Sequence, residues 1–157
     1  MRKKDVEKIS LSKIVQIGIV VKDVDKAVEY YSKKFNMGPF RVVIAKRSGA
    51  LVHGKPMDYA QKIAFTQLGD IQIELMQVIE GRPIQKEFLE EKGEGLHHLC
   101  FRVEDLDAEI AKWEKQGIKC IQRSKPPGPG FAMMDTTEVG GTIFELSQPA
   151  PEEPRKS

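Results

Sequence analysis

Four polar side chains stand in otherwise apolar runs of this sequence, where a buried polar group is costly unless it has a partner: Gln16, Glu74, His98 and Glu145. Two of them are carboxylates, which repel each other in a shared pocket unless a proton or a cation lies between them. One imidazole, two carboxylates and one amide oxygen suit a single divalent ion such as Zn, Ni, Co, Mn or Mg. If the fold brings the four together, we expect a metal centre.

An internal repeat gives the reason to expect that they meet. The segment VQIGIVVKDVDKAVEYYSKKFNM (15–37) has the same pattern as HHLCFRVEDLDAEIAKWEKQGI (97–118). Each has a strand-like run, an acidic turn and then a helix-like run. The match makes Gln16 equivalent to His98.

The repeat continues downstream. The stretch GDIQIELMQ (69–77) corresponds to GGTIFELSQ (140–148), and both read as strands that contain Glu-Leu. Glu74 is therefore equivalent to Glu145. Unrelated surface residues have no reason to recur at equivalent places, so the repeat favours a shared site over four separate exposed positions.

Helical spacing of apolar residues predicts one helix in each copy, after the first strand. Asp23 and Asp105 are expected as N-caps, and Gly38 and Gly117 as the helix ends. The first copy is about eleven residues longer than the second. We expect the extra residues to form a long loop over 47–61, because that stretch is rich in Gly, Pro and polar residues.

Side chains alternate across a strand, and this alternation separates the two adjacent histidines. His98 is expected to face the inside of the curved sheet with Cys100. His97 is expected on the apolar side with Leu99 and Phe101, against a helix. We therefore assign metal chemistry to His98 and packing to His97.

The composition and net charge of the chain argue against several classes of protein. A net charge of +2 from 25 basic and 23 acidic residues gives no electrostatic case for a nucleic-acid or anionic-membrane partner. No apolar run reaches membrane-spanning length, and the basic MRKKDVEK start is not followed by a signal-peptide core. Cys100 and Cys120 lack the spacing of a zinc or redox motif, which fits a reducing compartment. We expect a cytoplasmic protein.

The predicted organisation is an α+β chain in five parts. A flexible N-terminus (1–12) precedes the first unit (13–80), and a linker with a short helix (81–95) leads to the second unit (96–148). The Pro-rich, charged tail (149–157) is expected to be disordered, because it has nothing to bury.

From about residue 14 to 148 the sequence resembles the vicinal oxygen chelate superfamily, which includes glyoxalase I, methylmalonyl-CoA epimerase, extradiol dioxygenases and bleomycin-resistance proteins. The segments GEGLHHLCFRVEDLDA and GGTIFELSQ carry this resemblance. It implies two βαβββ modules whose sheets form a cup around one metal ion. The ligands then lie on the first and last strands of each module, at the positions of Gln16, Glu74, His98 and Glu145.

Two branches of that superfamily fit best. The two segments are most similar to methylmalonyl-CoA epimerases, which have His at the position of Gln16 and a separate catalytic glutamate whose nearest acid here is Asp58. A Gln, Glu, His, Glu ligand set instead resembles the zinc glyoxalase I enzymes. A dioxygenase is disfavoured, because it would need a second histidine on iron. A non-catalytic binding protein of the bleomycin-resistance type stays the third alternative.

The resemblance to either branch implies an isomerase or lyase that removes a proton from the carbon next to a carbonyl. Glu145 is then the expected catalytic base, and Glu74 a ligand and possible partner base. The expected substrate is an acyl thioester or a hemithioacetal, with no cofactor besides the divalent ion. Members of the superfamily usually pair, so we also expect a homodimer.

Overall fold

The structure is a computed structural model that describes residues 7–151 of the 157-residue chain. The predictions for the flexible first residues and the disordered tail therefore fall partly outside it, at 1–6 and 152–157. The described elements, in chain order, are β1 (Ile14–Val20), α1 (Val24–Phe35), β2 (Arg41–Val52), β3 (Lys55–Leu68), β4 (Ile71–Glu80), α2 (Ile84–Lys92), β5 (Gly95–Arg102), α3 (Leu106–Lys115), β6 (Cys120–Arg123), β7 (Gly130–Met134) and β8 (Ile143–Gln148).

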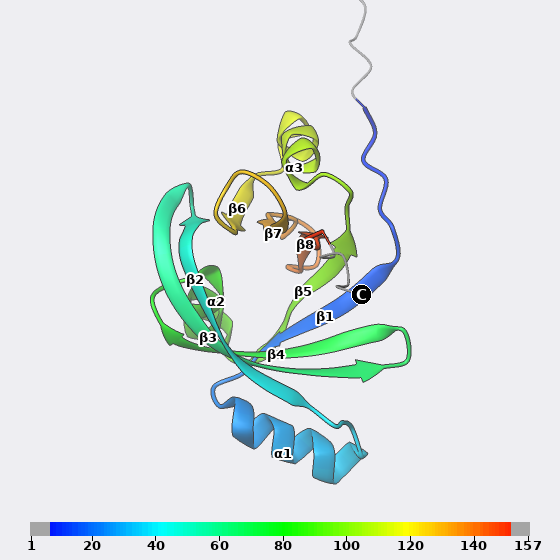
Figure 1. Ribbon diagram of the computed structural model, residues 1–157, viewed down its shortest axis with the longest axis vertical. Helices are drawn as coiled ribbons and strands as arrows, with labels where there is room; N and C mark the ends of the chain where they lie inside the picture. Colours follow the sequence, from blue (N-terminus) through cyan, green and yellow to red (C-terminus); the bar gives the residue numbers. More distant parts are fainter. Residues whose placement is uncertain (1–6, 152–157) are drawn as a thin grey trace, which may run out of the picture.

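Within the described residues, eight strands form one strongly curved sheet that closes on itself in the order β1-β4-β3-β2-β6-β7-β8-β5 (Figure 1). In each unit the first and last strands are parallel neighbours, β1 with β4 and β5 with β8. The units join edge to edge through the antiparallel pairs β1–β5 and β2–β6. This arrangement confirms the predicted α+β class and the cup-shaped sheet.

The closure of the sheet within one chain also bears on the predicted homodimer. Unpaired strand edges would be a physical reason to expect a second copy, because exposed edges invite association. Both edges of each unit pair with the other unit of the same chain. The homodimer stays a prediction from the family resemblance, without support from free edges.

The two equivalent helices begin as the sequence predicts. The Asp23 carboxylate accepts a hydrogen bond from the Lys26 N–H, and the Asp105 carboxylate accepts one from the Ala108 N–H. Helix α1 packs outside β3 and β4, and α3 packs outside β7 and β8 (Figure 1). The predicted end of α1 at Gly38 is wrong. The helix ends at Phe35, because Asn36 adopts the left-handed conformation, which Asn tolerates better than most residues.

A repeated glutamine ties each helix to the last strand of its own unit. The Gln77 side-chain oxygen accepts a hydrogen bond from the Val24 N–H, and the Gln148 oxygen accepts one from the Leu106 N–H, both at 2.9 Å. These N–H groups lie in the first turn of α1 and α3, where the helix itself offers no acceptor. The two glutamines therefore fix the helix starts against β4 and β8.

The extra residues of the first unit are not a loop. Strands β2 and β3 run through 47–61 and turn at His53 and Gly54, whose φ angles are 49° and 76°. Two successive positive φ angles are typical of a two-residue hairpin turn. We call residues 47–61 the hairpin arm. Its tip pairs with β6 at Leu51 and Val52, and this pairing closes the sheet.

Helix α2 fills one end of the barrel from the linker between the units. Its Phe88 packs against a cluster inside the barrel that contains Val20, Ile63 and Met76. The outer clusters are separate, one under α1 and one under α3. The barrel interior is therefore apolar next to α2. Its buried polar side chains lie further along the strands.

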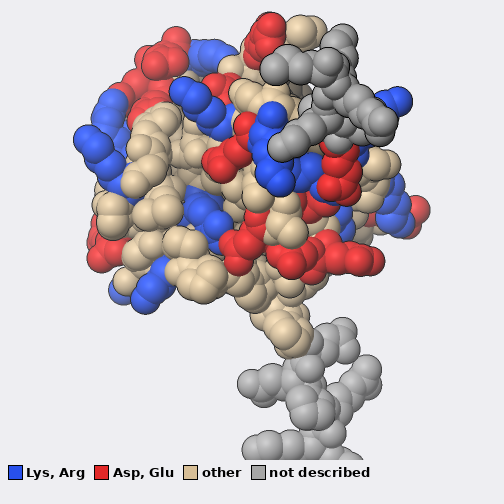
Figure 2. Space-filling model, turned by 90° about the horizontal axis from the view of Figure 1, so that it is seen from above, with Lys and Arg blue, Asp and Glu red and all other residues tan. Residues whose placement is uncertain are grey.

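The outer surface agrees with the nearly balanced charge. On the face seen in Figure 2, acidic and basic side chains are interspersed. The described helices have 12, 9 and 10 residues, and none of them has the length and apolar composition needed to span a bilayer.

We predict that Gln77→Met and Gln148→Met each lower the free energy of unfolding by about 1 to 2 kcal/mol, because each leaves a helix N–H without its acceptor. Urea unfolding followed by circular dichroism measures the change. The control is Gln67→Met, since within residues 7–151 the exposed Gln67 amide bonds only to the Gly69 carbonyl in a turn. Losses no larger than that of the control would contradict the capping role.

Candidate metal centre

Four adjacent strands, β4-β1-β5-β8, carry the four predicted ligands, one ligand on each strand. Gly18 is the register partner of both Glu74 and His98. Cys100 is the partner of both Gln16 and Glu145. The sheet pairing thus places all four side chains within two residues of one another along neighbouring strands, on its concave side.

The side chains converge on the His98 ring. Its Nε2 lies 3.2 Å from the Gln16 Oε1, 3.3 Å from the Glu74 Oε2 and 3.0 Å from the Glu145 Oε2. Ligand atoms of the histidine and the two glutamates all lie within 4.8 Å of one another. Atoms bound about 2.1 Å from one ion stand roughly 3.0 to 3.4 Å apart in octahedral or tetrahedral geometry. The three distances to the His98 Nε2 fall in this range, and the four side chains have the donor chemistry that one divalent ion needs.

The cluster is buried and favours a positive charge. His98 is 0% exposed, and Glu74 and Glu145 are each 8% exposed. Burial alone lowers the pKa of His98, but the neighbouring Glu145 and Glu74 outweigh it and raise that pKa to about 10. A proton on His98 Nε2 and a divalent ion would compensate the same carboxylates, so the two compete for one place.

Two further side chains orient the ligands. The Gln16 Nε2 donates a 2.8 Å hydrogen bond to the Gln72 Oε1, which leaves the Gln16 oxygen directed at His98. The Cys100 thiol donates to the Glu145 Oε1 at 3.7 Å. Burial and then the charge of Glu145 raise the pKa of Cys100, so the thiol keeps its proton and is not a thiolate ligand.

Gly18 makes room for the central histidine. A Cβ atom at this position would lie 2.1 Å from His98 Cε1, far inside contact distance. The His98 ring therefore lies directly over the β1 backbone. A single Gly inside a strand often marks such a close approach, so the sequence carried this signal.

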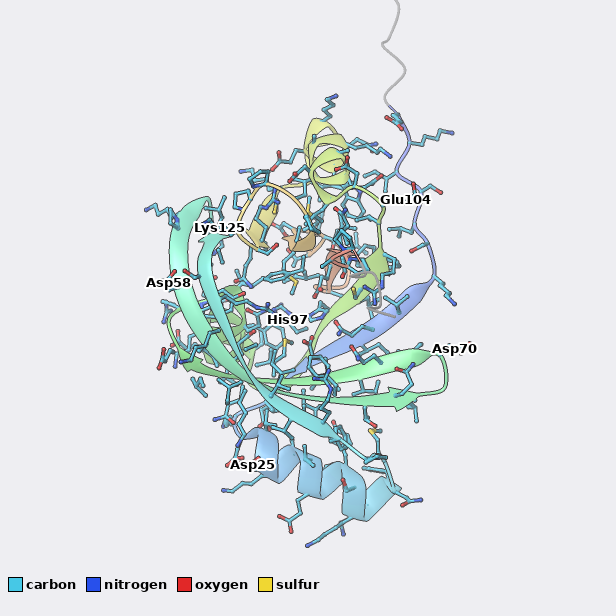
Figure 3. The ribbon with its side chains drawn as sticks, viewed as in Figure 1. Asp25, Asp58, Asp70, His97, Glu104 and Lys125 are labelled. Carbon is cyan, nitrogen blue, oxygen red and sulfur yellow. The ribbon has the colours of Figure 1, made fainter. Side chains whose placement is uncertain are left out.

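His97 does not lie where alternation places it. Between β1 and β5, Ile19 pairs with Leu96 and Gly18 with His98, so His97 is an extra residue in β5. At such a β-bulge the regular alternation breaks down. Figure 3 shows His97 inside the barrel, where its Nδ1 lies 3.1 Å from the Nδ1 of His98. The expectation that it shares the outer face with Leu99 and Phe101 is therefore wrong.

The pKa of His97 indicates which of the two histidine rings donates the hydrogen bond between them. Burial, followed by the charge of His98, lowers the pKa of His97 to about 3, so His97 is neutral. A neutral His97 Nδ1 accepts from the N–H at Nδ1 of His98, which directs Nε2 of His98 at the carboxylates. Such a second hydrogen bond commonly fixes the ring of a metal-binding histidine. The ring of His97 is itself held by an edge-on contact with Phe88.

Two cavities meet at Glu145. A wider one of about 430 Å³ opens at one end of the barrel between Lys13 and Arg102 and includes Gln16. A smaller one of about 40 Å³ lies between the hairpin arm and β7, and Glu74 lines it. The centre thus has a polar mouth on one side and a small compartment on the other.

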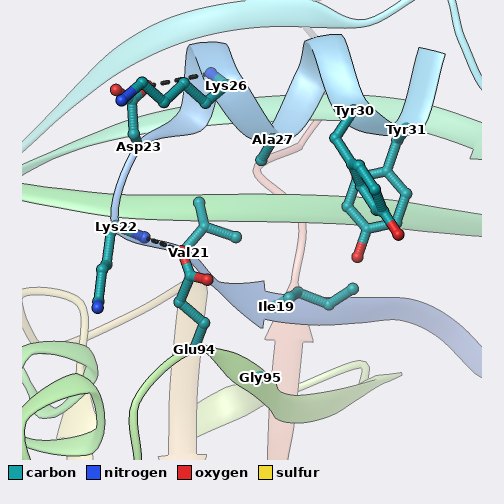
Figure 4. A pocket seen from close by; sticks show the side chains of 10 residues that line it. All are labelled: Ile19, Val21, Lys22, Asp23, Lys26, Ala27, Tyr30, Tyr31, Glu94 and Gly95. Atoms are coloured by element: carbon teal, nitrogen blue, oxygen red, sulfur yellow. Dashed lines mark hydrogen bonds between the residues drawn. The ribbon is translucent and has the colours of Figure 1, made fainter. Parts of the chain in front are cut away.

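Asp58, the further acid suggested from the sequence, is not brought into the centre. It is exposed on the hairpin arm, where its carboxylate accepts a hydrogen bond from the Gly49 N–H at 2.8 Å (Figure 3). It lines neither cavity at Glu145. A third cavity, of about 590 Å³, lies outside the barrel between α1 and the start of β5 (Figure 4). Tyr30 and Tyr31 line it, but none of the four predicted ligands does.

Comparison with known proteins places these features in a family. A sequence profile described as "Glyoxalase/Bleomycin resistance protein/Dioxygenase superfamily" matches residues 15–136. An uncharacterized protein of Bacillus subtilis, YqjC, is 24% identical over 143 residues, which cover 88% of this chain and 94% of that protein. Human mitochondrial methylmalonyl-CoA epimerase is 24% identical over 145 residues, which cover 88% of this chain and 75% of the enzyme.

The fold agrees with these matches. The crystal structure of methylmalonyl-CoA epimerase from Mycobacterium tuberculosis superimposes with a TM-score of 0.61 at 23% identity. The superposition covers 96% of this chain and 94% of the epimerase. At that identity the likeness concerns the fold alone.

We predict that Gly18→Ala weakens binding of Zn²⁺ or Co²⁺ about 10- to 100-fold, because the added methyl group displaces the His98 ring. Competition against a chromophoric chelator measures the affinity, and circular dichroism checks the fold. Gly95→Ala is the matched control, since a Cβ there meets nothing within 4 Å. Equal affinities of the two variants would contradict the role of Gly18.

The raised pKa of His98 predicts a pH dependence of metal binding. Below about pH 10 the metal-free His98 carries a proton that an incoming ion must displace. The metal affinity should therefore rise about tenfold per pH unit between about pH 6.5 and 8.5. Chelator competition at several pH values, corrected for protonation of the chelator, tests this. An affinity that levels off above about pH 7 would indicate a histidine with its ordinary pKa.

Proposed function

The chain belongs to the glyoxalase/bleomycin resistance protein/dioxygenase superfamily, and on that basis we propose that it is a metal-dependent enzyme. The proposed reaction removes a proton from the carbon next to a substrate carbonyl and then returns it. The observation that carries this proposal is the buried convergence of Glu74, His98 and Glu145 on one point. A protein that only binds apolar ligands has no need to keep two carboxylates inside its barrel.

The proposed substrate is an acyl thioester, and the reaction is an isomerisation of the methylmalonyl-CoA epimerase type. Curated relatives with that activity support this choice. The wide cavity beside Glu145 supports it as well, since its lining is mainly polar and includes two basic side chains, Lys13 and Arg102, against one exposed acid, Asp70. A long anionic carrier could leave the centre through that mouth while the acyl group stays inside.

In the proposed mechanism Gln16, Glu74 and His98 hold the ion, with Glu145 as the fourth ligand and the base. The ion would act as a Lewis acid on the substrate carbonyl and stabilise the negative charge that develops as the proton leaves. The Glu145 carboxylate would take the proton from one face of the carbon, and Glu74, as partner base, would deliver a proton to the opposite face, which inverts the centre. The thiol of Cys100 donates to one oxygen of this carboxylate and holds it in place.

The surroundings favour this chemistry. The Phe88 side of α2 and the Met76 cluster close one end of the barrel, which keeps water away from that side of the centre. Electrostatic stabilisation is stronger in such a shielded site than in water. His97 keeps the His98 ring oriented while the charge on the substrate changes.

One observation favours a second candidate, a glyoxalase I-like reaction on a hemithioacetal. Inverting a stereocentre requires proton transfer on both faces of the carbon, whereas moving a proton between adjacent carbons requires only one base. Asp58 lies outside the barrel, so the carboxylates at the centre are Glu74 and Glu145. If both hold the ion and only Glu145 is free to act as a base, the one-base reaction is the simpler one.

The test is incorporation of solvent deuterium, measured by NMR, into methylmalonyl-CoA and separately into the hemithioacetal of methylglyoxal and a thiol. We predict exchange into methylmalonyl-CoA, and a loss of about 10²- to 10⁴-fold in Glu145→Gln, because the base is gone. Glu80→Gln, which alters an exposed carboxylate on the strand of Glu74, is the control and should exchange normally.

Each other outcome identifies a different function. Exchange into the hemithioacetal alone would replace the epimerase reading by the glyoxalase one. Exchange into neither substrate, by protein that holds one ion per chain, would leave another carbonyl compound as the substrate. If the chain purifies without metal and takes none up, a non-catalytic binding protein would be the remaining alternative. Full exchange by Glu145→Gln would remove Glu145 as the base.

A further inference from the structure

The hairpin arm lines the inside of the barrel with donors that have no acceptor. Arg47 on β2 is the register partner of Tyr59 on β3, and Gln61 follows two residues later on the same face. All three line the 40 Å³ compartment together with Glu74 and Glu145. Tyr59 is 3% exposed and Gln61 4% exposed, so water reaches neither freely.

The donors are unsatisfied within residues 7–151. The Arg47 Nε and the Gln61 Nε2 are buried and have no hydrogen-bond partner there. The Tyr59 hydroxyl accepts a bond from the Gln122 Nε2 at 3.3 Å, which leaves its own proton available. Burial raises the pKa of Tyr59, so that proton stays on the oxygen. Buried donors without acceptors are rare in native proteins and call for a partner.

The charge balance indicates what the partner is. Arg47 takes part in none of the ion pairs within the described residues, and its guanidinium lies over the Phe131 ring at 5.3 Å. Arg47 is half-exposed with its Nε buried, and once a divalent ion neutralises Glu74 and Glu145 the compartment lining offers it no other negative group. One negative group of the substrate would balance it. A guanidinium binds a carboxylate especially well, because its N–H groups match the two carboxylate oxygens.

The size of the compartment limits that group. A cavity of about 40 Å³ holds a few waters or one small polar group, so it cannot take a carrier such as a nucleotide. The wide mouth on the other side of Glu145 has the room that a carrier needs. The group in the compartment therefore belongs to the short, acyl end of the substrate, close to the reacting carbon.

We infer that Arg47, Gln61 and Tyr59 form a subsite for a carboxylate on the acyl part of the substrate. This inference rests on the proposed function, whose methylmalonyl substrate carries such a carboxylate, and it assigns the residues that would bind that group. Arg47 supplies the charge and two directed N–H groups, and Gln61 and Tyr59 supply one donor each. The arm thus selects the substrate, while the four strands behind it hold the reacting centre.

The experiment compares two small chelators on the full-length, Zn²⁺-loaded protein by isothermal titration calorimetry. Acetohydroxamate can bind the ion through two oxygens, and the monohydroxamate of malonic acid binds in the same way but adds a carboxylate. We expect the second probe to bind about 10- to 100-fold more tightly to the unaltered protein, the range for hydrogen bonds to a charged group. In Arg47→Met this preference should fall to about threefold or less, with the affinity for acetohydroxamate unchanged.

Two further comparisons sharpen the result. Arg41→Met is the matched control, because it also removes an arginine of β2 that lies over a ring, that of Phe65, but Arg41 is exposed and does not line the compartment. It should keep the full preference for the carboxylate. Tyr59→Phe removes one donor with little change in shape and should lose part of the preference.

The outcomes separate the two proposals. Binding of Zn²⁺ and acetohydroxamate without a preference for the carboxylate would overturn the subsite and leave the metal centre in place. An equal preference in Arg47→Met and Arg41→Met would also overturn it. Failure to bind Zn²⁺ at all would overturn the proposed function, and the subsite with it. Unchanged acetohydroxamate binding by each variant shows that the variant is folded.

Discussion

Two carboxylates buried side by side need a compensating cation. Several features of the barrel interior are arranged around that need. Glu74 and Glu145 come from the two repeated units, so neither unit creates the conflict alone. His98 lies between them, which is possible only because Gly18 leaves its backbone bare. The bulge at His97 then brings a neutral acceptor behind the ring. The centre therefore depends on small local departures from a regular sheet.

The convergence of four polar side chains could be predicted from the sequence because it depends on two robust regularities. A repeat places Gln16 with His98, and period-two alternation in β1, β4, β5 and β8 puts the ligands on one face. The same alternation misplaced His97. A bulge adds one residue to a strand without any distinct letter in the sequence, so the error arose where regular geometry stops.

The hairpin arm shows a different limit. Its Gly, Pro and polar residues resemble a loop, and only the positive φ angles at His53 and Gly54 show that the chain makes a tight hairpin there. Its partner β6 follows the strand tips by about seventy residues, so local patterns carry no sign of the pairing. The meeting of Arg47 with Tyr59 and Gln61 around a compartment near Glu145 was equally invisible, because it requires the arm to curl over the centre.

The arm belongs to one repeat only. Its counterpart in the second repeat, β6 and β7, is short and contributes mainly closure. The two units thus contribute differently, since each supplies two of the strands that carry the convergent side chains and only the first supplies an arm. The arm reaches the centre in two ways, because its strand β3 pairs with β4, the strand of Glu74, and its side chains line the compartment that Glu74 and Glu145 also line. Substitution of arm side chains would therefore reshape the compartment while the register between β3 and β4 stays intact.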